Sequence, residues 1–193
     1  MSTIAKTYIP EELQKIIKSY LDLNQFEKIA VLRTINSVNV NSISDGKFLD
    51  LFINLEYINN IRKINSFHKI VRQNLANDSI YICCAETISQ RAKKFRHRIP
   101  RGFKNLFLML DFLFKRVIPK LPLTKYLYFS ITKGHNRVLS KAEILGRISS
   151  CGFRILNSFN YKNKLYVISK KNKESKAISK PSYGLFISLD RVG

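Results

Sequence analysis

The chain has 193 residues, with 34 Lys and Arg against 13 Asp and Glu, which gives a formal net charge of +21. Hydrophobic residues make up 45% of the chain and aromatic residues 11%, so it contains enough apolar side chain for a core and is not a disordered protein by composition. Its three cysteines exclude a paired extracellular disulfide framework, and the charge predicts an anionic partner, either nucleic acid or the acidic face of a membrane.

The first 47 residues are predicted to contain one helix and a poorly defined segment. Pro10 followed by two Glu residues is a helix-start signal, and apolar residues then recur at helical spacing. Residues 26–32 are a candidate strand. Residues 36–44 are rich in Asn and Ser, which predicts a loop.

Residues 48–169 are predicted to form an α/β domain. The apolar runs 48–55 and 80–85 flank the helical pattern of residues 61–75, and strand, helix and strand in this order predict a right-handed parallel crossover in an open sheet. Cys83 and Cys84 would then point to opposite faces as small buried residues. His68 lies beside the apolar stripe of the helix, which predicts a half-buried side chain with one hydrogen bond.

The end of this domain is predicted from its caps and turns. Ser140 and Glu143 form a capping-box pattern before an apolar run, and Gly152 is placed to end that helix. Residues 153–159 and 165–169 predict an antiparallel hairpin. Residues 170–193 are interpreted as a basic linker and the start of a further segment.

A basic and apolar insertion is predicted at residues 88–135. Six Lys or Arg and no acid lie between Arg91 and Arg101, and the run 106–114 is apolar except for Asp111. Such a run is too short to cross a bilayer, but beside basic residues it can bind an anionic membrane surface. The predicted membrane-binding residues are Arg91, Lys93, Lys94, Arg96, Arg98, Arg101, Lys104, Phe107, Phe112, Lys115 and Arg116.

Two alternatives to membrane binding stay open for this insertion. A solvated surface with no partner explains the basic run as well as a membrane-binding surface does. Nucleic-acid binding is less favoured, because the aromatic residues cluster with Leu and Met and do not alternate with basic residues as a base-stacking surface would.

No catalytic or metal-ligating set is predicted. Gly46 is the only glycine in the first 101 residues, so the glycine-rich turn that lets a backbone approach a nucleotide or S-adenosylmethionine is absent. Asn54 and Glu56 at the end of one predicted strand, and Glu86 at the end of the next, lie where open α/β sheets place ligands. They are candidate pocket residues, and solvated strand ends are the alternative, because no nucleophile or base joins them.

Three stretches of the chain suggest a family. Residues 110–125, 136–153 and 181–193 resemble the region upstream of the catalytic core in bacterial polyprenyl-phosphate sugar-phosphate transferases. That region is itself similar to the second half of a Rossmann-like methyltransferase domain. The resemblance implies an incomplete Rossmann-like sheet with a C-terminal antiparallel hairpin.

The resemblance also implies a function. The chain would be an accessory or scaffold region in cell-surface polysaccharide biosynthesis, cytoplasmic and peripheral at the inner face of the bacterial plasma membrane, with polyprenyl-phosphate pathway enzymes as partners. No catalytic residue of the family can be placed on this chain, so it is expected to be inactive alone. No cofactor is implied in this chain, since magnesium belongs to the missing transferase core. The alternatives are a degenerate S-adenosylmethionine-dependent methyltransferase-like protein that binds a small anionic ligand, and a nucleic-acid-binding module.

Overall fold

The computed structural model describes residues 2–5, 8–44, 48–98, 104–118, 121, 130 and 137–172. One six-stranded sheet organises these residues, in the order β1-β2-β3-β4-β6-β5. The strands are β1 (Ser2–Ala5), β2 (Lys28–Leu32), β3 (Leu49–Tyr57), β4 (Leu75–Ala85), β5 (Phe153–Tyr161) and β6 (Lys164–Lys171). Strands β1 to β4 are parallel, and β6 pairs antiparallel with both β4 and β5.

This topology confirms the predicted parallel crossover and the predicted hairpin. It also shows that the first 47 residues contribute to the same sheet, because β1 pairs with β2 and β2 pairs with β3. Strand β6 continues to Lys171, two residues past the predicted end of the hairpin. Residues 173–193, interpreted above as linker and start of a further segment, lie outside the described residues.

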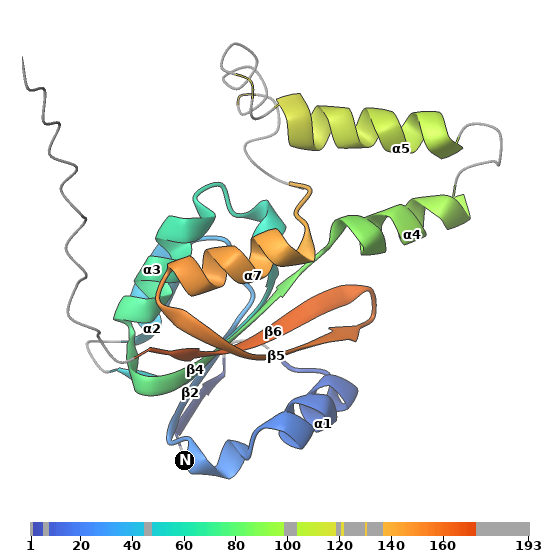
Figure 1. Cartoon of the computed structure of the whole chain (residues 1–193). Helices are drawn as coiled ribbons and strands as arrows, with labels where there is room; N and C mark the ends of the chain where they lie inside the picture. The colour runs from blue at the N-terminus through green and yellow to red at the C-terminus, as the bar shows by residue number, and fades with distance from the viewer. Residues whose placement is uncertain are drawn as a thin grey trace, which may run out of the picture.

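Helices cover both faces of the sheet (Figure 1). They are α1 (Glu11–Tyr20), η1 (Leu23–Gln25), α2 (Ser37–Ser44), η2 (Ile58–Asn60), α3 (Ile64–Gln73), α4 (Ile88–Arg98), α5 (Lys104–Phe112), η4 (Leu113–Val117, a π-helix) and α7 (Lys141–Ser150). One core cluster packs α2, α3 and α7 on one face, and a second packs α1 on the other. Cys83 belongs to the first cluster and Cys84 to the second, which confirms that they point to opposite faces.

Helix α2 corrects the predicted loop at residues 36–44. Val40 and Ile43, three residues apart, are both buried in the core beside α3. The Asn36 side chain accepts a hydrogen bond from the Val38 N–H at 3.0 Å and so satisfies one of the free donors at the helix start. Burial of one apolar face therefore outweighs the weak helix propensity of Asn and Ser.

Local signals place α7 and the hairpin as expected. The Ser140 hydroxyl accepts a hydrogen bond from the Glu143 N–H at 3.1 Å, which confirms the N-cap. Gly152 ends the helix with φ +88°, a conformation that favours glycine. The hairpin turns through Lys162 and Asn163, both with positive φ, as a two-residue turn between right-twisted strands requires.

Candidate functional site

The first candidate site is the edge of the sheet at the carboxyl ends of β2, β3 and β4. Asn54 is fully buried there, three residues before the end of β3. Its amide nitrogen donates to the Thr34 carbonyl at 3.0 Å, and its amide oxygen accepts from the Thr34 N–H at 3.2 Å and from the Glu56 N–H at 3.1 Å. Asn54 therefore joins the end of β3 to the chain that leaves β2.

A second amide, Asn59 in η2, fixes the end of β4. Its nitrogen donates to the carbonyls of Glu86 at 2.9 Å and Arg137 at 2.7 Å, and its oxygen accepts from the Glu86 N–H at 2.8 Å. No local pattern in the sequence marks Asn59, because its partners lie 27 and 78 residues away along the chain.

The structure brings the three predicted pocket residues to one edge of the sheet. Burial raises the pKa of Tyr57, and the nearby Cys84, Glu86 and Glu56 add to the effect. Glu56 accepts a hydrogen bond from the Asn60 amide at 2.9 Å, and Glu86 forms ion pairs with basic residues of α4. The polar groups of this edge are thus bonded to the protein itself.

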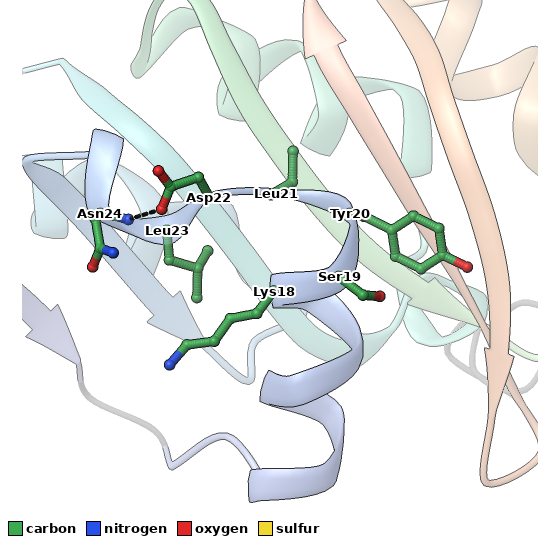
Figure 2. Close-up of a pocket in the computed structure, with 7 residues that line it drawn as sticks. All are labelled: Lys18, Ser19, Tyr20, Leu21, Asp22, Leu23 and Asn24. Atoms are coloured by element: carbon green, nitrogen blue, oxygen red, sulfur yellow. Dashed lines mark hydrogen bonds between the residues drawn. The ribbon is translucent and has the colours of Figure 1, made fainter.

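Three of the surface hollows formed by the described residues are lined by other side chains than Asn54, Glu56 and Glu86. The first, of about 450 Å³, follows the end of α1, and Figure 2 shows the side chains of Lys18 to Asn24 fanning outward without meeting at one point. The second, of about 280 Å³, lies between the start of α4 and the β5–β6 turn. The third, of about 380 Å³, is a mainly apolar hollow along α5 and η4.

The second candidate site is the pair of helices α4 and α5. Figure 1 shows α4 extending beyond the sheet and α5 beside it, farther out. Arg91 joins them: its Nε and Nη2 donate to the two carboxylate oxygens of Asp111 at 2.8 and 3.1 Å, while its Nη1 donates to Glu86 at 3.1 Å. The side chains of Arg91 and Asp111 are only 12% and 13% exposed.

The predicted membrane-binding residues divide into three groups. Arg91 is bonded to two carboxylates of the protein, those of Glu86 and Asp111. Lys93, Lys94 and Phe112 are exposed on α4 and α5. The remaining members lie where the structure describes no side chain, and Arg101 lies outside the described residues altogether; these members are Arg96, Arg98, Lys104, Phe107, Lys115 and Arg116.

Large apolar side chains are exposed along α5 and η4. Leu106 is 53% and Met109 59% exposed, and Leu110, Leu113 and Phe114 are similar. In the described part of the chain, no helix is long and apolar enough to cross a membrane. Within the same residues, no cluster of His, Cys, Asp and Glu is arranged to hold a metal ion.

Burial moves the pKa values of three buried groups, His68, Cys83 and Cys84, away from neutral pH. Burial raises the pKa of the Cys83 thiol, and it raises the pKa of the Cys84 thiol to about 12. His68 is fully buried, where the sequence predicted a half-buried side chain, because it packs between Phe67 and Tyr81. Its Nδ1 shares a hydrogen bond of 3.2 Å with the Tyr81 hydroxyl, and burial, with the charge of Arg147, lowers its pKa to about 4.

No family model and no curated protein matches the sequence. Among solved structures, the chain is similar to a SAM-dependent methyltransferase from Methanosarcina mazei, with 14% identity and a TM-score of 0.45 over 82% of this chain and 98% of that chain. A chain of the complex between the Haloferax volcanii Trm112 methyltransferase activator and a methyltransferase gives 7% identity and a TM-score of 0.48 over 83% and 89%. An S-adenosylmethionine dependent methyltransferase from Mesorhizobium loti gives 8% identity and a TM-score of 0.40 over 74% and 79%.

These comparisons concern the fold alone. The strand order itself, with four parallel strands and a C-terminal antiparallel hairpin, defines a Rossmann-like α/β fold. The comparisons add no support to the resemblance to sugar-phosphate transferases, which depends on the sequence stretches by themselves.

The residues after β2 do not fit a cofactor cradle. The connection from β2 to α2 reads Arg33-Thr34-Ile35-Asn36 and contains no glycine. The Thr34 hydroxyl accepts from the Asn36 N–H at 3.0 Å and from the Asn39 amide at 2.9 Å, so side-chain bonds fill the turn. A ligand cannot approach this backbone as closely as it can approach a glycine-rich turn.

Proposed function

We propose that this chain is a degenerate methyltransferase-like domain that acts as a docking scaffold on the anionic inner face of the bacterial plasma membrane. The observation behind this proposal is the pair α4–α5, in which a basic helix lies beside a helix with exposed apolar side chains. Helix α4 contains five Lys or Arg and no acid, in a chain of net charge +21. Each basic residue near an anionic leaflet contributes on the order of 1 kcal/mol, and apolar side chains inserted in the interface add to that.

The carboxyl edge of the sheet supports a scaffold role. Its two central amides, Asn54 and Asn59, are bonded to backbone groups of neighbouring segments. The turn after β2 is closed by Thr34. We derive no methyl-transfer step for this chain, because the described residues at this edge form neither a cofactor cradle nor a base–nucleophile pair.

Vesicle binding tests the docking proposal. Co-sedimentation with vesicles that contain about one-third phosphatidylglycerol should show binding that weakens as salt rises, whereas zwitterionic vesicles should bind poorly. Met109→Ser and Phe112→Ser should each weaken binding several-fold, because each removes an exposed apolar side chain of α5.

A matched control is Val38→Ser on α2. Val38 is 63% exposed and lies away from the α4–α5 pair, so the same kind of change there should leave vesicle binding intact. If the two α5 variants bind like the wild type while salt still abolishes binding, charge alone accounts for the interaction and the insertion of α5 is refuted. Tight, steeply salt-dependent binding to DNA or RNA, with none to vesicles, would replace the membrane by nucleic acid.

A second candidate function is the binding of a small anionic ligand at the carboxyl edge. The methyltransferase-type fold favours it, since that edge is where such sheets place ligands, and Arg33 supplies an exposed cation there. Isothermal calorimetry with an anionic nucleoside phosphate such as AMP tests it: a saturable signal that Arg33→Gln abolishes would support a ligand site. If the folded wild type gives no heat of binding, the proposal of a ligand site at this edge is refuted.

The place of the scaffold in polysaccharide biosynthesis is supported by the sequence resemblance. Its partners would be polyprenyl-phosphate pathway enzymes, and magnesium would belong to those partners. Deletion of this chain should reduce surface polysaccharide, and re-expression of the wild type should restore it where Met109→Ser does not. Unchanged polysaccharide after deletion would contradict this role.

A further inference from the structure

Helices α4 and α5 are attached to the domain differently from α1, α2, α3 and α7. Neither of the two core clusters contains any described residue of α4, α5 or η4. By contrast, α1, α2, α3 and α7 each bury apolar residues in one of them. Hydrophobic burial in the described core therefore does not determine where α5 lies.

The start of α4 is fixed to the sheet. The Ile88 N–H donates to the Leu139 carbonyl at 3.0 Å, and the Gln90 amide donates to the Asn160 side chain of β5 at 2.9 Å. Thr87 precedes the helix, pairs with Leu139 as an isolated β-bridge and accepts the Arg91 N–H at 2.9 Å. Arg91 thus lies in the first turn of α4, which these bonds attach to the sheet.

From that turn, one guanidinium contacts both the sheet and α5. Arg91 donates one hydrogen bond to Glu86, directly after β4, and two parallel hydrogen bonds to Asp111 in α5. Burial acts to lower the pKa of Arg91, but the hydrogen bonds and charges of Asp111 and Glu86 overcome it and leave the pKa above its ordinary value. We name this group of Arg91, Glu86 and Asp111 the Arg91 bridge.

We infer that the Arg91 bridge positions α5 beside α4 so that the apolar side chains of α5 and the basic side chains of α4 meet a membrane together. This inference depends on the proposed docking function. It assigns Arg91 and Asp111 a positioning role and takes Arg91 out of the set that binds lipid directly. The same bridge explains why the otherwise apolar run 106–114 contains one acid, Asp111.

The geometry explains why these residue types are needed. A bidentate pair between a planar guanidinium and a carboxylate fixes orientation as well as distance, whereas a Lys ammonium forms only a point contact. A positioning role and a purely electrostatic role then predict opposite effects for Asp111→Asn. The variant raises the net charge by one, so charge alone would tighten binding to anionic vesicles about fivefold. Loss of the bridge would instead weaken it.

The experiment measures vesicle binding and helix geometry on the full chain. Asp111→Asn and Arg91→Lys should each bind anionic vesicles roughly tenfold more weakly, as expected if α5 occupies its docking position about a tenth of the time. Arg91→Lys conserves charge, and Lys93→Gln, which removes an exposed charge outside the bridge, is the control for charge alone. Circular dichroism of each variant confirms that the domain is folded.

The distance between α4 and α5 is measured in the absence of membranes, between spin labels attached at Lys93→Cys on α4 and Met109→Cys on α5. The three native cysteines are buried and should stay unlabelled. A single narrow distance distribution is expected with the bridge intact and a broad one with Asp111→Asn or Arg91→Lys.

The outcomes separate this inference from the proposed function. If the wild type binds vesicles but Asp111→Asn binds as tightly or more tightly, or if the distance distribution stays narrow, the bridge does not position α5 and the docking proposal stands. If the wild type does not bind vesicles, the proposed function fails, and the distance measurement alone decides whether the bridge holds the two helices together.

Discussion

The buried imidazole of His68 makes the stability of this protein depend on pH. Its pKa is lowered to about 4 in the folded protein, first by burial and second by the charge of Arg147. In the unfolded chain the group titrates near its ordinary pKa of about 6.5. On acidification the unfolded chain therefore binds a proton that the folded protein excludes. The resulting stability is fully present above about pH 6.5 and is lost as the pH falls toward about 4.

The size of the effect follows from the two pKa values. Linkage gives a loss of about 2 kcal/mol at about pH 5 and about 3 kcal/mol at about pH 4 relative to neutral pH. Urea unfolding followed by far-ultraviolet circular dichroism at a series of pH values measures this loss. The comparison protein is His68→Gln, which has no proton to gain at this position while every other acid and base is the same in both chains.

We expect the free energy of unfolding of the wild type to fall more steeply than that of His68→Gln between neutral pH and about pH 5, by about 2 kcal/mol. The absolute stability of the variant does not matter, because only the difference between the two pH dependences is compared. Parallel curves for the two proteins would show that His68 is solvated or paired in the folded state, and would refute the reasoning.

Three further predictions concern the fold. Gly152→Ala should destabilise the protein by about 1–3 kcal/mol, because residue 152 has a φ of +88° and an added Cβ would lie 2.6 Å from the Arg72 Nε. A melting temperature equal to that of the wild type would contradict this prediction. Asn59→Leu should cost about 1–3 kcal/mol in urea unfolding, since it leaves the Glu86 N–H and carbonyl without their partner. Asn24→Leu, at an exposed position of η1, is the control. The thiol of Cys84, with a pKa of about 12, should not react with a thiol reagent at neutral pH until urea unfolds the chain, and rapid labelling of the native protein would show that β4 is exposed.

Much of this fold is determined by short-range patterns in the sequence. The apolar run 80–85 becomes a central strand because both of its faces are buried, and Ser140 with Glu143 starts α7 because a cap needs only a hydroxyl and an N–H three residues apart. The hairpin that follows Gly152 was predicted for the same reason, since strand, turn and strand are contiguous.

Only the tertiary structure shows the elements whose formation depends on residues far away in the sequence. Residues 37–44 are helical because Val40 and Ile43 find a buried surface on other elements, which their Asn- and Ser-rich surroundings do not indicate. The short β1 forms its hydrogen bonds with β2, and helix α1 separates the two strands in the sequence.

The same division applies to the candidate sites. The sequence placed Asn54, Glu56 and Glu86 at one edge of the sheet, because the carboxyl ends of parallel strands lie together. It could not show that Asn54 bonds to Thr34, 20 residues away, or that Arg91 faces Asp111, also 20 residues away. Charge and hydrophobic pattern are properties of a chain segment and can be read locally. Whether a given guanidinium meets a lipid or a carboxylate is determined only when folding brings separate helices together.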